Sequence, residues 1–321
     1  HVDAALAWIE GSLDADGFLA YDGRQGTLAN QGWKDSGDAI VDIDGSLARP
    51  PIRLVEVQGY VYEARRLIAE LLERDGDVAR ARGLRARAAS LRRAFDRQFW
   101  LAERSHLALG LQATAQPIRT LTSNAGQALW SGIVTAPKAR ATGRAVTGPS
   151  MFNGWGIRTL AADERRYDPL GYHLGTVWPH DNAMIVAGLR RYGLDAAAER
   201  VFTGLFEAAI DFPGHRLPEL FAGFSRDEYE APVAYPVACH PQAWAAGAMP
   251  AMLASMLGLE PDGFARHLLV RRPRLPSWLP SVHLRGLRVG SGRADLRFTR
   301  EVGGSTRLEV LRSRDLDVDQ A

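Results

Sequence analysis

The sequence predicts an all-α body followed by a small β-rich segment at its C-terminal end. Between residues 52 and 74, apolar side chains recur every three or four positions, which places them on one face of an α-helix. Residues 79–100 repeat this pattern after the turn at Asp75-Gly76-Asp77. Alternation of apolar and polar residues, which is typical of strands, begins only after residue 265.

Shorter runs of the same periodicity predict the remaining helices. Seven helices are clear, and an eighth would fit the pattern; the clear ones cover residues 2–12, 52–74, 79–100, 122–134, 177–192, 195–211 and 238–257. Strands are predicted over 267–270, 282–289, 293–299 and 306–311. We therefore divide the chain into a helical domain, residues 1–262, and a small β-rich segment, residues 263–321.

The composition is that of an ordinary globular protein, with 46% hydrophobic and 24% charged residues. No apolar run approaches the ~20 residues that a membrane helix needs. The net charge is +2, and the basic residues are interleaved with acidic ones, as on solvated helix faces. We therefore expect neither a nucleic-acid partner nor a membrane partner.

Cys239 is the single cysteine, which excludes a disulfide framework and a multi-cysteine metal site within this chain. No base and orienting group accompany it in the sequence, so we expect a buried and inert thiol. The cysteine usage favours a reducing compartment, and we expect a bacterial cytoplasmic protein. Because the chain begins inside a predicted helix, we also expect that it is a fragment of a longer protein.

Long loops rich in Trp, Gly, Asp and His connect the helices, and long loops in compact domains are usually functional. The first covers residues 30–38. Its Trp33 offers a flat apolar face for a sugar ring, while Lys34, Asp35 and Asp38 offer hydrogen bonds to hydroxyl groups. The alternative is a turn or helix cap with a solvated acid.

The second loop covers residues 172–182 and leads into a helix. It contains His173, Trp178, His180 and Asp181. The adjacent His and Asp lack a third ligand and any HExxH-like spacing, so we expect no metal here. Capping of the following helix by the acid remains an alternative, but the aromatic company favours a polar pocket with aromatic walls.

The third loop places Glu219 between two leucines, where a charged side chain is costly unless it is paired or functional. An ion pair with Arg216 or Arg226 is one interpretation. A carboxylate adapted for proton transfer is the other. Two further loops supply candidate pocket residues, although their tryptophans would also suit a core: Trp155, Arg158, Gln242 and Trp244.

Six segments together resemble bacterial amylo-α-1,6-glucosidases of the glycogen-debranching type. They are, in order, NQGWKDSGDA, TLTSNAGQALWSGI, MFNGWGIRTLA, YHLGTVWPHDNAMIVAGLRRYG, LPELFAG and YPVACHPQAWAAGA, and they cover roughly residues 28–257. That group is similar to glucoamylases, trehalases and mannosylglycerate-hydrolase-like enzymes. The resemblance implies an (α/α)6 barrel and inverting hydrolysis of an α-glucosidic bond.

The resemblance also implies the catalytic pair. Asp35 of the GWKDS motif is carried over as the general acid, and Glu219 of LPELF as the general base, with carboxyl groups ~6.5–9.5 Å apart. The acid needs a raised pKa. In trehalase-like relatives the acid lies one position closer to its motif glycine than Asp35 does to Gly32, so Asp38 stays open as the acid.

An (α/α)6 barrel has six helical hairpins, more than the predicted helices supply, so we expect an incomplete barrel with the missing helices before His1. The substrate is expected to be an oligosaccharide or a small α-glucoside such as glucosylglycerate or trehalose, and acid–base hydrolysis requires no cofactor. Alternatives are a phosphorolytic enzyme, which the base Glu219 disfavours, and a non-catalytic carbohydrate-binding helical protein. A terpene cyclase would need better metal motifs than DAIVDIDG at 38–45.

Overall fold

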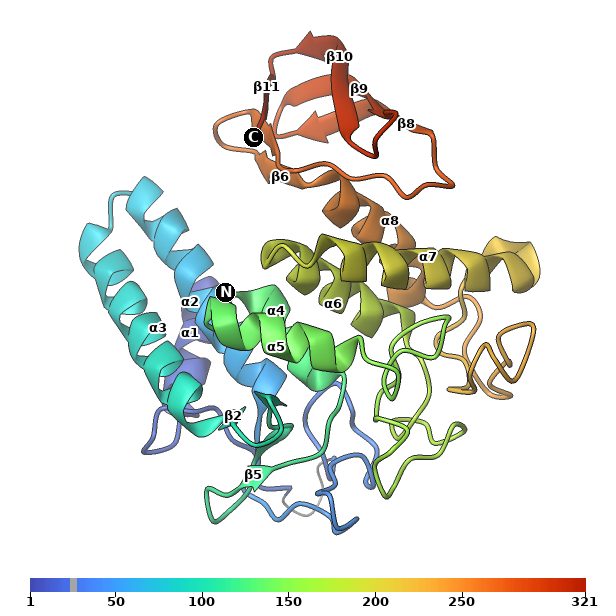
Figure 1. Ribbon diagram of the computed structural model, residues 1–321. Coiled ribbons are helices and arrows are strands. Elements are labelled where there is room, and N and C mark those ends of the chain that lie inside the picture. Colours follow the sequence, from blue (N-terminus) through green and yellow to red (C-terminus); the bar gives the residue numbers. More distant parts are fainter. Residues whose placement is uncertain (24–27) are drawn as a thin grey trace.

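Eight α-helices form the body of the computed structural model, which describes residues 1–23 and 28–321 (Figure 1). The helices predicted from the periodicity are present, with ends that differ by a few residues. Their bounds are α1 Val2–Gly11, α2 Val55–Arg74, α3 Val78–Gln98, α4 Asn124–Ser131, α5 Ala136–Val146, α6 Pro179–Arg191, α7 Asp195–Asp211 and α8 Ala243–Leu257, with a 3₁₀ turn η1 at Pro213–His215.

The helices are arranged in two layers. Helices α2, α4, α6 and α8 pack side by side in that order, and α3, α5 and α7 each lie against the preceding member of this row. The chain thus alternates between an inner and an outer helix, as a series of helical hairpins does. The loops that lead into α2, α4 and α6 gather below the helices in Figure 1.

Helix α5 was not among the clear helices, because its sequence APKARATGRAV contains glycine and threonine. The structure gives the reason for the glycine. A Cβ on Gly143 would lie 2.3 Å from Cδ1 of Leu194, so a larger residue would require the Leu194 side chain at the start of α7 to move. Gly143, which weakens the helical pattern in the sequence, is therefore a position where α5 packs closely against its neighbour.

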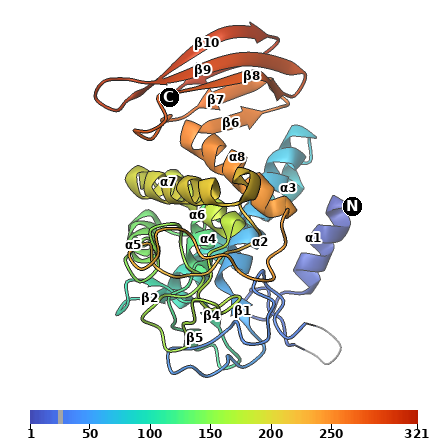
Figure 2. The same ribbon diagram turned by 90° about the vertical axis from the view of Figure 1, so that its right-hand side faces the viewer.

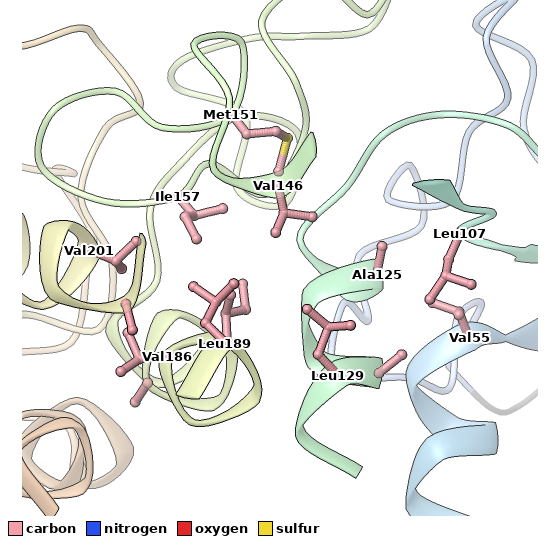
Figure 3. Packing of buried hydrophobic residues seen from close by; sticks show 14 of the residues in the cluster. Val55, Leu107, Ala125, Leu129, Val146, Met151, Ile157, Val186, Leu189 and Val201 are labelled. Atoms are coloured by element: carbon pink, nitrogen blue, oxygen red, sulfur yellow. The ribbon is translucent and has the colours of Figure 1, made fainter. Parts of the chain in front are cut away.

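One hydrophobic core extends through the helical body and fixes the two layers against each other. In the part that Figure 3 shows, Leu189 from α6 and Leu129 from α4 lie in the middle, with Val201 from α7 on one side and Val55 from α2 on the other. Met151, from the loop after α5, completes this part of the core. Tight packing of this kind holds the loop-bearing ends of the inner helices in fixed relative positions.

The chain ends in two small sheets that rest on the end of α8 (Figure 2). One is antiparallel with strand order β8-β9-β10. In the other, of order β6-β7-β11, β7 and β11 run parallel. A second core containing Leu257, Leu268, Leu296 and Phe298 lies between them. The strands are β6 Leu259–Asp262, β7 His267–Val270, β8 Ser281–Val289, β9 Gly292–Arg300, β10 Thr306–Arg314 and β11 Asp317–Gln320.

The loops also contain five two-residue strands: β1 Arg53–Leu54, β2 Trp100–Leu101, β3 His106–Leu107, β4 Gly110–Leu111 and β5 Pro117–Ile118. The all-α prediction is therefore incomplete, since strands occur both in the loops and in the C-terminal part. The first C-terminal strand begins at Leu259, just before the predicted domain boundary. Within the described residues, no helix has the length and apolarity to cross a bilayer.

Candidate active site

Glu219 is held by three hydrogen bonds in a buried segment after η1. Its side chain is only 9% exposed. The Tyr172 hydroxyl donates to Oε1 at 3.0 Å, and the backbone N–H of Cys239 donates to Oε2 at 3.0 Å. The backbone N–H of Glu219 in turn donates to the carbonyl of Cys239. The carboxylate therefore has a fixed orientation, and Arg226, one predicted partner, instead pairs with Glu207.

Asp35 is exposed and lies in a loop that is anchored on both sides of it. Before it, the Lys34 ammonium donates to the carbonyl of Thr159 at 2.6 Å. After it, a 2.8 Å hydrogen bond joins the Ser36 hydroxyl and Nδ1 of His173. The carboxylate of Asp35 thus projects from a backbone whose two neighbours are both bound to other loops.

Tyr172 connects the two candidate catalytic carboxylates. Burial, its hydrogen bond to Glu219 and the charges of Glu219 and Asp35 all raise the pKa of Tyr172. The charges of both carboxylates therefore act on the same hydroxyl group. Asp38 is exposed and is not named among the causes of this shift. Of the two acids, Glu219 contacts Tyr172 directly through a hydrogen bond.

Five predicted pocket residues form one aromatic cluster beside this pair. The Trp33 ring lies 5.1 Å from His180, 5.5 Å from His173 and 5.7 Å from Trp178, measured between ring centroids. His180 stacks on Trp244 at 3.9 Å with an interplanar angle of 5°. Trp244 remains 42% exposed, so the cluster offers a flat apolar face to a ligand.

Polar atoms in this cluster lack protein partners. Nε1 of Trp33 and both ring nitrogens of His180 are buried without a hydrogen-bond partner among the described residues. Burial lowers the pKa of His180 to about 4, so this ring is neutral at pH 7, with one donor and one acceptor. His180, Trp130 and Trp244 line a cavity of about 260 Å³ between α6 and α8. Buried polar atoms of this kind are usually satisfied by a protein group or an ordered water molecule.

Three of the predicted pocket residues serve the structure elsewhere. Trp155 packs in the main hydrophobic core, with the Arg226 guanidinium 4.2 Å from its ring. Arg158 is buried and donates to the carbonyl of Gly223 at 2.7 Å. Gln242 caps α8 by accepting from a backbone N–H. The sequence predicted a pocket at these positions because glycines and polar residues flank them, whereas the structure places the side chains in the core or in a helix cap.

Lys34 and Asp181, which were expected to contact substrate, are completely buried with a third group, Glu56. Burial lowers the pKa of Lys34 to about 8, against the opposing effect of Asp181 and Glu56. Burial raises the pKa of Glu56 to about 7, and it also raises the pKa of Asp181. Glu56 was missed in the sequence, although it stands in the apolar run that starts α2.

Cys239 corrects a further prediction, because its side chain is exposed and not buried. Its backbone exchanges hydrogen bonds with Glu219, so the position matters for its main chain. Tyr172 was also missed as a functional candidate, although it precedes His173 in a predicted functional loop. In the ranges 1–23 and 28–321, no cluster of three His, Cys, Asp or Glu residues is arranged to bind a metal ion.

The layered helical hairpins resemble those of α/α-barrel glycosidases, and the chain matches a glycoside hydrolase family. It belongs to the family described as the mannosylglycerate hydrolase MGH1-like glycoside hydrolase domain, whose model matches residues 9–215. This family lies within the six-hairpin glycosidases to which the sequence resemblance pointed. A search of the curated proteins finds no match to the chain.

Solved structures share the fold at low sequence identity. A GH78 rhamnosidase of a Bacillus species is 15% identical with a TM-score of 0.64, over 100% of this chain and 30% of its own. The neutral trehalase of Saccharomyces cerevisiae is 14% identical with a TM-score of 0.53, over 69% of this chain and 41% of its own. The GH63 mannosylglycerate hydrolase of Thermus thermophilus in complex with glucose is 19% identical with a TM-score of 0.51, over 63% and 45%. The chain thus spans less than half the length of these proteins.

Proposed function

We propose that the chain is the catalytic part of an inverting glycoside hydrolase that cleaves an α-glucosidic bond, with Asp35 as general acid and Glu219 as general base. The observation that carries this proposal is that the charges of both carboxylates raise the pKa of Tyr172. This tyrosine lies beside the aromatic cluster that contains Trp33 and Trp244. Inverting glycosidases need two carboxyl groups on opposite faces of the sugar, ~6.5–9.5 Å apart.

The surroundings of each carboxylate suit its proposed role. Glu219 receives one hydrogen bond on each oxygen, which fixes the direction in which it orients a water molecule for attack. Asp35 is exposed and projects from an anchored loop, so its proton is accessible to the oxygen of the bond that breaks. Asp38 is the second candidate for the acid, and it is not named among the causes that raise the pKa of Tyr172.

The reaction then proceeds in one displacement. Asp35 donates its proton to the glycosidic oxygen as the bond to the anomeric carbon breaks. Glu219 removes a proton from a water molecule that attacks the same carbon from the other side. The sugar ring rests on the exposed apolar face that Trp244 contributes to the cluster.

For the substrate, we propose an α-1,6-glucosidic branch, as in glycogen debranching, on the basis of the six sequence segments that resemble amylo-α-1,6-glucosidases. A small α-glucoside such as glucosylglycerate or trehalose is the second candidate. The family match and the trehalase and mannosylglycerate hydrolase folds favour this second candidate, since those names refer to small glycosides.

The stereochemistry of the product tests the mechanism. Isomaltose, trehalose and 4-nitrophenyl α-D-glucopyranoside are incubated with the chain and with the full protein that contains it, and the anomeric protons are followed by NMR. With 4-nitrophenyl α-D-glucopyranoside, which releases a single glucose, we expect β-glucose to appear first and then to mutarotate. Initial release of α-glucose from this substrate would rule out inversion; with trehalose, inversion gives α- and β-glucose in equal amounts. Absence of hydrolysis with a full-length protein and all three substrates would contradict the proposed α-glucosidase.

A further inference from the structure

Arg158 is a buried cation without a carboxylate partner. Four arginines of the described chain are buried, and three of them form ion pairs: Arg53 with Asp14, Arg65 with Glu10 at 2.9 Å, and Arg190 with Asp195 at 2.6 Å. Arg158 is 5% exposed, and within the described residues no Asp or Glu oxygen lies within 4.0 Å of its guanidinium. Burial of a charge without a counter-charge is costly. Arg158 therefore differs from the other three in lacking an anionic partner.

Backbone carbonyls and an aromatic ring hold the guanidinium in place. Nε donates to the carbonyl of Gly223 at 2.7 Å, and Nη1 makes a longer contact of 3.4 Å to that of Ser150. The guanidinium carbon lies 5.6 Å from the centre of the Tyr167 ring, whose hydroxyl donates to the same Gly223 carbonyl. These groups carry partial charges only. Nη2 donates to no described residue and is not among the fully buried atoms, so it remains open to a ligand.

Besides holding the backbone at Gly223, Arg158 forms one wall of a pocket of about 500 Å³. Tyr167, Phe224 and Tyr229 line the same pocket. The rings of Phe224 and Tyr229 lie 5.0 Å apart between centroids, at 54° to each other, and Tyr229 is 47% exposed. Sites for small molecules combine apolar or aromatic walls with a few polar groups. The pocket thus offers a ligand one cation and an apolar face.

Among the described residues that line this pocket, Glu228 is the single acid. Its carboxylate accepts from the backbone N–H of Ser225 at 3.2 Å, and its side chain is exposed, so water and salt screen its charge. The buried guanidinium of Arg158 is screened much less. An anion that enters the pocket is therefore attracted by Arg158 more strongly than Glu228 repels it.

The pocket is separate from the proposed active site. Within the described residues, it shares no lining residue with the cavity at His180 and Trp244. Gly223 follows Glu219 by four residues, so at most ~14 Å of extended chain separates them. The pocket therefore adjoins the segment that carries Glu219, and it has no role in the mechanism above.

We propose that this pocket binds an anionic saccharide: a carboxylate or phosphate group on the sugar pairs with Arg158, while the sugar ring lies against Phe224 and Tyr229. Both carboxylate and phosphate suit the planar guanidinium, which can donate from Nη1 and Nη2 together. The aromatic faces suit the apolar side of the ring. This site does not depend on the roles proposed for Asp35 and Glu219.

Binding is tested by calorimetric titration of the chain at low ionic strength with glucose 6-phosphate, glucuronate and glucose. At least one of the two anionic sugars binds about 10-fold more tightly than glucose, because only it offers a charge to Arg158. A preference between the two identifies the anion as phosphate or carboxylate. Equal affinity for all three sugars, or no binding of any of them, would overturn the proposal.

Arg158→Gln lowers the affinity for the preferred anionic sugar to that for glucose. Arg200→Gln is the matched control: Arg200 also lacks a carboxylate within 4.0 Å, donates to the carbonyl of Thr147 and lies 4.9 Å from the Phe152 ring, but it is exposed and lines another pocket. The control changes the affinity by less than about 2-fold. Wild-type affinity in a folded Arg158→Gln variant, checked by circular dichroism, would overturn the role of Arg158.

Two exposed positions decide the matter if Arg158→Gln does not fold. Glu228→Gln removes the repulsive charge and raises the affinity for the anionic sugar about 3-fold, without an effect on glucose. Tyr229→Ala removes an apolar face and lowers the affinity about 5-fold or more. Wild-type affinity in both variants would overturn the proposal. Loss of binding in Trp244→Ala, together with wild-type binding in Tyr229→Ala, would place the anionic sugar at the aromatic cluster and would also overturn it.

Discussion

Charged side chains are arranged in opposite ways at the two ends of the molecule. Beneath the loops, Lys34, Glu56 and Asp181 are completely buried. In the sheet β8-β9-β10 at the other end, charged residues such as Arg297 and Glu309 are paired at 3.5 Å on the solvent-exposed face. The comparison shows that the protein buries charged side chains directly beneath its proposed catalytic loops, although such burial is energetically costly.

The two arrangements differ physically because solvent screens exposed charges and does not screen buried ones. An exposed ion pair gains only about 0–1 kcal/mol because water and salt screen it. A buried charge is not screened, so it fixes the position of its partner strongly and penalises every alternative arrangement. The β-rich segment needs stability alone, which its apolar core supplies. The loop end needs two carboxylates at a defined separation.

The largest expected effect concerns the two carboxylates at the loop end. Asp35→Asn and Glu219→Gln should each lower kcat about 10²- to 10⁴-fold, because each removes one partner of the proton transfer. Binding of glucose, measured by calorimetry, should change little. Asp38→Asn is the matched control and should retain most of its activity. A loss in Asp38→Asn, together with an active Asp35→Asn variant, would move the acid to Asp38.

A smaller effect is expected from pH and the buried group. Burial raises the pKa of Glu56 from 4.5 to about 7, so between these values the folded state keeps a proton that the unfolded state has lost. The contribution of Glu56 to stability therefore falls as the pH rises through this window. Glu56→Gln does not titrate, and its amide oxygen still accepts from Asn124.

The corresponding measurement is the Tm of both proteins at several pH values. The Tm of Glu56→Gln minus that of the wild-type protein should increase by a few degrees between pH 5 and pH 7. A difference that stays constant over this range would mean that Glu56 is not the group that titrates there.

The smallest effect is expected at the opposite end of the molecule. Removing the exposed pair by Arg297→Ala or Glu309→Ala should change the free energy of unfolding by less than about 1 kcal/mol, and the change should vanish in high salt. Chemical denaturation at low and high ionic strength measures both. A loss of several kcal/mol in the free energy of unfolding, as expected for breaking a buried charge pair, would contradict the contrast between the two ends.

Much of the helical body was predictable, because apolar periodicity reports directly which face of a helix is buried. Helix α5 shows the limit of this signal. Its Gly143 reduces helix propensity locally and packs closely against Leu194, which is distant in the sequence. The strands of the C-terminal segment were predictable in part, since alternation identifies a strand but not its partner.

The candidate site was predictable as a set of loops, but the roles of individual residues within those loops were not. The stretch around Lys34 and Asp35 indicates a functional loop, yet only the tertiary structure reveals that one side chain points inward and the next outward. Glu56 was missed because one acid in a helical stripe resembles a solvated position. Cys239 was expected to be buried because cysteine usually is, whereas here its backbone carries the contacts.

The parallel pairing of β7 with β11 has a consequence for how the protein is made. Strand β7, at residues 267–270, pairs with residues 317–320, which the ribosome adds about 50 residues later. At typical rates of synthesis, β7 is made roughly 2 to 10 s before β11, and one edge of β7 is unpaired during that time. During that interval β7 has only β6 as its neighbour, and the apolar side of the pair lacks Leu316. Nascent chains stalled in this interval should therefore be the ones that chaperones bind and proteases cut.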